Sequence, residues 1–238
     1  MKSLNQYIQE KLIINKDYHD NMIVVKSFDE LRKIIEDRYN KLGPGTEQDP
    51  IDFNDIDVSN LDSFCDKNIG IFEKTRFKYI DISDWDVSNI ESMRQMFYMC
   101  KELESIGDLS KWNVSNVNDM SYMFAFCKKF NQDLSEWDVS NVAYMLYAFF
   151  FCESFNQDIS SWNVSSVNNM DSMFAYCKIF NQDISDWNVS NVENMTEMFY
   201  YCKNFNKDIS DWNVSKVMYK KGAFDNCPIK EEYKPKFK

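Results

Sequence analysis

The sequence repeats one pattern with a fixed period of 25 residues over most of its length. Trp85 lies 27 residues before the first member of a regular tryptophan series, and a cysteine follows each of these six tryptophans 15 residues later. The series is Trp112, Trp137, Trp162, Trp187 and Trp212. Such a period is typical of a solenoid, in which each unit buries its apolar face only against its neighbours. The sequence therefore predicts one elongated repeat domain.

The apolar positions within one repeat predict a strand followed by a short helix. The stretch 187–189 alternates as a strand does, whereas Val192, Met195 and Met198 have helical spacing. Ser190 stands where such a helix would need its N-cap. The sequence therefore predicts an α/β fold of 25-residue coils, each with one or two short strands and about three turns of helix.

The residues before the repeats predict a strand and a helix that cap the first coil. The run 22–25 is apolar and β-branched, which favours a short buried strand. Ser27 and Glu30 form a capping box at the start of a helix, and Gly43 ends it. The expected organisation is a leader at 1–17, a capping strand and helix at 18–50, a degenerate first coil at 51–84, regular repeats at 85–227 and a basic tail at 228–238.

Composition excludes some partners and environments. The net charge of −11 disfavours nucleic acid, which needs a clustered basic face. No apolar run is long enough to insert into a membrane. The first residues contain no uninterrupted apolar stretch and no small-residue cleavage site, so we expect no signal peptide and synthesis in the cytoplasm. Six of the seven cysteines share one repeat position and are expected to be reduced and buried, and Cys65 is expected to be the exposed thiol.

The repeat pattern resembles a known family. The pattern FNQDISxWNVSNVxxMxxMFxxC, read at 180–202, is similar to the 25-residue repeats of BspA-like leucine-rich-repeat surface proteins. The resemblance covers roughly residues 51–227. It implies a leucine-rich-repeat-like, right-handed solenoid with a parallel strand ladder and no enzyme active site. Members are described as surface or lipoprotein adhesion-type proteins. Because no signal peptide or lipobox cysteine is found here, cell-surface display is the less favoured location.

The leader gives a second, shorter resemblance. Residues 3–17 resemble the openings of some proteins from bacteriophages of gut bacteria. This resemblance implies a protein that is addressed to a capsid or another large assembly, such as a virion. The leader has one apolar helical face, which would be the docking surface: Leu4, Tyr7, Ile8 and Leu12.

An aspartate stands four residues before each tryptophan, from Asp81 to Asp208. One interpretation is a turn, in which the carboxylate accepts backbone N–H hydrogen bonds. The alternative is Ca²⁺ bound between coils by the carboxylates of Asp133, Asp158, Asp183 and Asp208. The turn is favoured because no glycine-rich loop is present to wrap a cation, and no cofactor is expected.

Asparagine and serine also recur in columns, at Asn116, Asn141 and Asn191 and the serines before them. Side-chain amides at such positions can hydrogen-bond to turn backbone groups of the neighbouring coil. A row of glycan-binding asparagines is the alternative, and the structural ladder is favoured.

Aromatic residues precede the cysteines and recur one helical turn earlier. Not all of them can face the core, so an exposed aromatic stripe is expected to bind a protein or a glycan. The candidate partner-binding residues are Tyr122, Phe126, Tyr147, Phe151, Tyr176 and Tyr201. The alternative is stacking between coils that only covers the outer side of the repeats.

Catalysis has little support in the sequence. The only histidine, His19, lies in a linker, and nothing orients it toward Cys65. No phosphate-binding, nucleophile-elbow or zinc motif is present. The sequence therefore predicts a non-enzymatic scaffold for protein or glycan recognition, with a component of a large assembly such as a virion as the alternative and a calcium-binding solenoid as the second.

Overall fold

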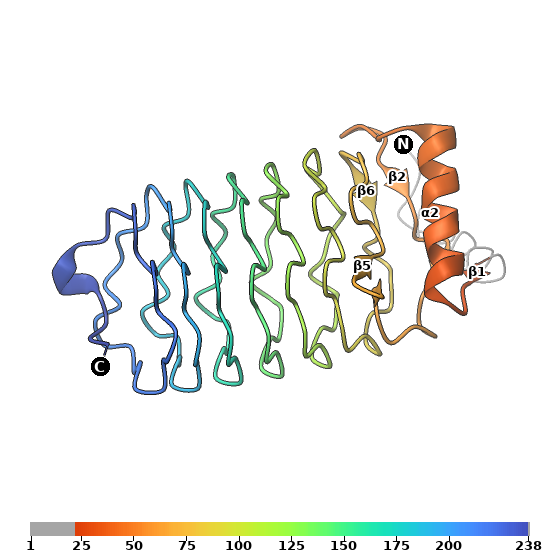
Figure 1. Cartoon of the computed structure of the whole chain (residues 1–238). Coiled ribbons are helices and arrows are strands. Elements are labelled where there is room, and N and C mark those ends of the chain that lie inside the picture. The colour runs from red at the N-terminus through yellow and green to blue at the C-terminus, as the bar shows by residue number, and fades with distance from the viewer. Residues whose placement is uncertain (1–21, 238) are drawn as a thin grey trace, which may run out of the picture.

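A computed structural model of the chain describes residues 22–237, in which the repeats lie side by side in chain order (Figure 1). One helix flanks the stack at the N-terminal end and a single helical turn lies at the other end. The elements are β1 (Ile23–Val24), α2 (Phe28–Leu42), β2 (Ile51–Asp52), β3 (Ile56–Asp57), β4 (Cys65–Asp66), β5 (Ile69–Gly70), β6 (Ile80–Asp81) and the 3-10 turn η1 (Glu231–Tyr233). Turns and irregular backbone make up most of the rest.

Helix α2 begins and ends where the capping signals predict. The hydroxyl of Ser27 accepts a hydrogen bond from the N–H of Glu30 at 3.3 Å, and Gly43 adopts a φ of 79° after the last turn. Leu31 and Ile35 are fully buried against the first repeat. The helix is also held by Arg38, whose guanidinium makes two hydrogen bonds to the carboxylate of Asp55 at 2.7 and 2.6 Å.

The strand predicted at 22–25 forms only in part. β1 pairs in parallel with β3, while β2 pairs in parallel with β6 and β4 antiparallel with β5. The prediction that this strand is buried was wrong for Ile23 and Val24, which are 41% and 51% exposed. Only Val25 is in the core, because β1 lies at the end of the stack and one of its sides faces outward.

The predicted helices of the repeats do not form. Their place is taken by a chain of four-residue β-turns, illustrated by residues 145–152. The N–H groups of Ala148, Phe150 and Cys152 donate to the carbonyl three residues earlier, at 3.0–3.1 Å. Every other N–H donates instead to the next repeat, as from Met145 to Asn169 at 3.0 Å and from Phe149 to Met173 at 3.0 Å. This alternation excludes the continuous i to i−4 pattern of an α-helix.

The alternation requires two residues per repeat in the left-handed region, four positions apart. Their φ angles lie between 51° and 67°. The first set, which we call column A, is Gln95, Tyr122, Tyr147, Ser172, Glu197 and Gly222. The second set, column B, is Met99, Phe126, Phe151, Tyr176, Tyr201 and Asn226. For a residue with a side chain, this conformation costs about 1–2 kcal/mol.

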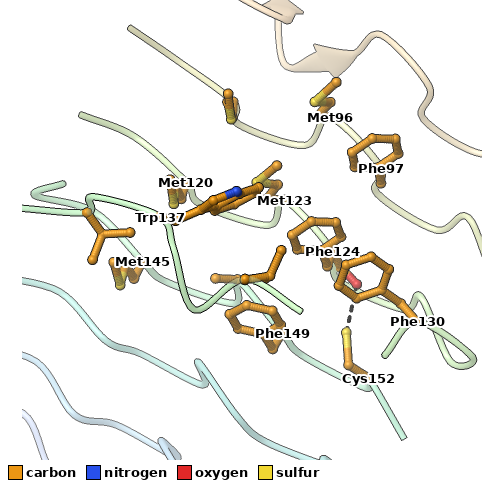
Figure 2. Close-up of a cluster of buried hydrophobic side chains, with 14 of the residues drawn as sticks. Met96, Phe97, Met120, Met123, Phe124, Phe130, Trp137, Met145, Phe149 and Cys152 are labelled. Carbon is orange, nitrogen blue, oxygen red and sulfur yellow. Dashed lines mark hydrogen bonds between the residues drawn. The ribbon is translucent and has the colours of Figure 1, made fainter. Parts of the chain in front are cut away.

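A periodic aromatic ladder fills the core (Figure 2). One ring per repeat stacks on the next from Phe72 to Phe224, with centroids 5.3–5.8 Å apart. A second column, from Phe130 to Phe205, packs beside the first, as where Phe124 and Phe130 lie 4.1 Å apart. The strand ladder between repeats is reduced to single parallel bridges. Packing of these rings against neighbouring repeats therefore replaces the helices as the source of the core.

The left-handed backbone predicts a reversal in the effect of glycine at two adjacent positions. At Glu197, where φ is 51°, glycine should give a higher free energy of unfolding than alanine, by about 1 kcal/mol. At Thr196, whose φ is not positive, glycine should be less stable than alanine. Urea denaturation of the four single variants measures both differences. If glycine changes the free energy of unfolding relative to alanine in the same direction at both positions, the left-handed assignment is contradicted.

Candidate functional site

Half-buried aromatic side chains gather on one side of the stack. We call this set the aromatic surface: Tyr98, Tyr122, Phe126, Tyr147, Phe150, Phe151, Tyr176, Tyr200 and Tyr201. It includes all six residues predicted to bind a partner. All six occupy columns A and B, so the same backbone constraint that rules out a helix places them at equivalent positions in successive repeats.

The rings of the aromatic surface are in continuous contact. In column B, Phe126 stacks on Phe151 at 5.4 Å, Phe151 on Tyr176 at 4.0 Å, and Tyr176 on Tyr201 at 5.2 Å. In column A, Tyr122 and Tyr147 stack at 4.8 Å. A third row inserts edge-on between these, as where Phe150 meets Phe126 at 5.1 Å and Tyr176 at 5.8 Å. The predicted residues therefore form one connected surface, and the stacking expected by the alternative interpretation is present as well.

Cationic groups border the aromatic surface. The guanidinium of Arg94 lies 5.1 Å from the ring centre of Tyr122, and the ammonium of Lys203 lies 4.1 Å from that of Tyr201. Burial raises the pKa of the Tyr122 phenol above its ordinary value, and the nearby phenol of Tyr147 adds to this. Cationic groups thus stand beside both column A and column B.

The asparagine column is a structural ladder, as predicted. The side-chain amide of Asn116 donates to the carbonyl of Ser88 at 2.6 Å, and that of Asn141 donates to Ser115 at 2.7 Å. Asn191 makes the same bond to Ser165 at 2.8 Å. Each amide thus joins one repeat to the repeat before it.

The aspartate column forms turns, as the favoured interpretation predicted. A carboxylate oxygen of Asp133, Asp158, Asp183 and Asp208 accepts the N–H of the serine two residues later, at 2.9–3.1 Å. Hydrogen bonds from the N–H and hydroxyl of Ser160 hold the pKa of Asp158 below its ordinary value. Within residues 22–237, no group of three or more His, Cys, Asp or Glu side chains is arranged to hold a metal ion.

The cysteine column has a role that the sequence did not reveal. The thiol of Cys152 donates to the carbonyl of Phe124 at 3.0 Å (Figure 2), and that of Cys177 donates to Phe149 at 3.0 Å. The same bond recurs from Cys100 to Cys202, so these buried thiols hydrogen-bond one repeat to the preceding one. All seven cysteines are free, as expected, and Cys65 is partly exposed. The prediction of burial was wrong for Cys227, which is only partly buried in the last repeat.

Some predictions lie outside the described residues. These are the docking residues Leu4, Tyr7, Ile8 and Leu12, together with His19. Cys65 lies within the described part, where burial raises the pKa of its thiol. A raised pKa is the opposite of what a nucleophilic cysteine needs.

These features define a repeat protein with a buried aromatic ladder and a half-exposed aromatic surface. One family model matches the chain twice, over residues 67–159 and 140–234. The chain belongs to the family described as Mycoplasma protein of unknown function, DUF285. No curated protein and no solved structure matches the chain. No helix in the stretch 22–237 is long and apolar enough to cross a membrane.

Thiol labelling should separate the cysteines by burial. Burial raises the pKa values of Cys127, Cys152, Cys177 and Cys202, so their reactive thiolate forms are scarce in the folded protein. We expect Ellman's reagent at pH 8 to modify Cys65 first, Cys227 more slowly, and the other five only after urea unfolds the chain. Rapid labelling of more than these two thiols in the native protein would contradict the structure.

The aspartate turns predict that the free energy of unfolding falls in acid. Because the folded pKa values of Asp158, Asp183 and Asp208 are lowered, their stabilisation is present above the ordinary value of 3.8 and is lost as the pH falls through the folded values. Urea denaturation should therefore show a decline in the free energy of unfolding below about pH 4. Replacing all three by asparagine should reduce this decline, whereas Asp186→Asn should not.

The same turns predict that calcium is not needed. Thermal unfolding measured with added Ca²⁺ and with EDTA should give equal midpoints, because the carboxylates already accept hydrogen bonds from their own turns. A midpoint that rises with Ca²⁺ would support the calcium-binding alternative.

Proposed function

We propose that the chain is a non-enzymatic recognition scaffold that binds a protein or glycan partner through its aromatic surface. In this proposal the stack is a leucine-rich-repeat-like, right-handed solenoid. The parallel bridges and the constant repeat support that architecture. The resemblance to BspA-like repeats supports an adhesion-type role.

One observation carries the proposal: aromatic residues occupy the left-handed column B in four consecutive repeats. These are Phe126, Phe151, Tyr176 and Tyr201. Glycine and asparagine tolerate this conformation best, and the last repeat has Gly222 and Asn226 at the two positions. Glycine or asparagine would therefore be less strained at these positions, yet four repeats have an aromatic residue there.

Stacking and partial burial within the chain offset the strain of the backbone. Each stacked pair contributes about 0.5–1.5 kcal/mol beyond the area that it buries, against a cost of about 1–2 kcal/mol for a left-handed residue with a side chain. Part of each ring stays exposed, and this area becomes favourable when a partner buries it. Backbone strain that persists at surface positions is a feature of functional sites.

The chemistry of this surface suits a ligand with its own flat apolar faces. Aromatic rings are the side chains that most often anchor protein interfaces, and cationic groups at the rim such as Arg94 and Lys203 add polar contacts. The proposal of a non-enzymatic role is supported by the raised pKa of the Cys65 thiol.

A triple substitution tests the proposal while keeping the backbone conformation. Asparagine at Phe126, Phe151 and Tyr176 copies the side chain that Asn226 places at the same position in the last repeat. The biotinylated full chain is first used to capture ligands from extracts of the source organism and on a glycan array. The affinity of each ligand is then measured by biolayer interferometry. The triple variant should bind at least about 30-fold more weakly.

A matched control carries three polar substitutions on exposed residues that precede the tryptophans: Glu136→Gln, Asp186→Asn and Asp211→Asn. Circular dichroism and thermal unfolding verify that both variants fold. Binding by the folded aromatic variant within about twofold of the control would refute the proposal, and the rings would then serve only to cover the core.

A further inference from the structure

A polar cleft of about 730 Å³ lies beside the stack, at the one irregular repeat among residues 85–227. Three successive repeats contribute to its lining through Tyr79, Glu104 and Lys129, and the loop after α2 adds Glu47 and Pro50. This volume falls within the range of small-molecule sites in proteins. None of the aromatic surface residues lines it.

The cleft lies where two extra residues separate Cys100 from Trp112. The backbone at Gly107 approaches the preceding repeat so closely that a Cβ atom there would lie 2.4 Å from a carboxylate oxygen of Asp81. Gly107 also has a φ of 89°, so no other residue fits there without strain. The regular surface of the repeats is therefore interrupted at this point.

The backbone at Gly107 is held in place by the neighbouring repeat. The amide oxygen of Gln132 accepts the N–H of Ile106 at 2.8 Å, while its amide nitrogen donates to the carbonyl of Gly107 at 2.8 Å. On the other side, the carbonyl of Pro44 accepts the N–H of Lys78 at 2.7 Å and fixes the loop after α2. The cleft is therefore preformed by backbone contacts.

Its polar groups are already oriented by one another. The phenol of Tyr79 donates to Glu104 at 2.5 Å, and the ammonium of Lys129 lies 3.1 Å from the other oxygen of the same carboxylate. Asp81 accepts hydrogen bonds from the N–H and the hydroxyl of Ser83 at 3.0 and 2.6 Å. Glu104 is thus paired with Lys129, whereas Glu47 and Asp81 leave the lining of the cleft with a net negative charge.

We propose that this cleft binds a short neutral saccharide. Carboxylate, ammonium, phenol and primary amide groups within one cleft supply both donors and acceptors to adjacent sugar hydroxyls. An anion is disfavoured because Glu47, Asp81 and Glu104 all line the cleft against the single cation of Lys129. Glu104 is paired with Lys129 and Asp81 is hydrogen-bonded to Ser83, which leaves few carboxylate oxygens for a polycation. Ile80 is buried, so an apolar ligand would find hydrocarbon mainly at Pro50.

Saturation-transfer NMR with the full chain tests this assignment. The probes are maltose, cellobiose, lactose and N,N′-diacetylchitobiose, each titrated to about 20 mM, and tetralysine is the competing probe. At least one disaccharide should saturate with a Kd in the low millimolar range, as expected for a small ligand held by a few hydrogen bonds. No saturable disaccharide, or displacement of the disaccharide by tetralysine at lower concentration, would overturn the proposal.

Two substitutions locate the site. Glu104→Gln should weaken binding about tenfold, since a hydrogen bond to a charged group is lost, and Tyr79→Phe should weaken it about threefold. The matched control is Glu153→Gln, because Glu153 also lies between two lysines, Lys128 and Lys178, but in a repeat without the insertion. Equal effects of Glu104→Gln and Glu153→Gln would overturn the proposal. The aromatic triple variant should keep full saccharide binding, which separates this site from the proposed aromatic one.

Discussion

The fold depends on hydrogen bonds that run from each repeat to the next along the turn segments. In residues 145–152 the N–H groups of the odd-numbered residues reach across to the following repeat, and those of Ala148, Phe150 and Cys152 close four-residue β-turns. A uniform helix would direct the N–H groups beyond its first turn to its own carbonyls, which leaves only those of the first turn to bond to a neighbouring repeat. This arrangement requires residues in the left-handed conformation, which strains the backbone. Because they recur at fixed positions, their side chains also recur, and the aromatic surface follows directly from the backbone pattern.

The core reinforces the same contacts without adding regular secondary structure. Phenylalanine rings stack from Phe72 to Phe224, while buried thiols and the indole N–H groups of every tryptophan except Trp137 donate to backbone carbonyls of the preceding repeat. These groups satisfy carbonyls that turns leave unpaired, which is necessary because buried carbonyls without partners destabilise a fold. The buried cysteines are therefore small apolar side chains, as their column suggested, that also donate weak hydrogen bonds to the neighbouring repeat.

The sequence predicted those parts of the structure that depend on local chemistry. The period, helix α2 with its cap at Ser27, the turns of the aspartate column and the amide ladder of Asn116 all depend on residue type and spacing. The prediction of helices in the repeats was wrong because apolar residues three apart suit both a helix and successive four-residue β-turns. Left-handed positions could not be predicted since Tyr122 or Phe126 is an unusual residue for them. The cleft depends on how closely the backbone at Gly107 approaches the preceding repeat, which spacing alone does not reveal.

Each repeat makes its hydrogen bonds and ring contacts with adjacent repeats, and this has a mechanical consequence. A force applied between the two ends would detach one repeat at a time from an end of the stack, because the hydrogen bonds between repeats in residues 85–227 join adjacent repeats. Each detachment would release about 80 Å of extended chain from a unit that occupies one layer of the stack. The protein would therefore lengthen in even steps and absorb work while most of its surface stayed intact. Such behaviour suits a link between bodies that move relative to each other.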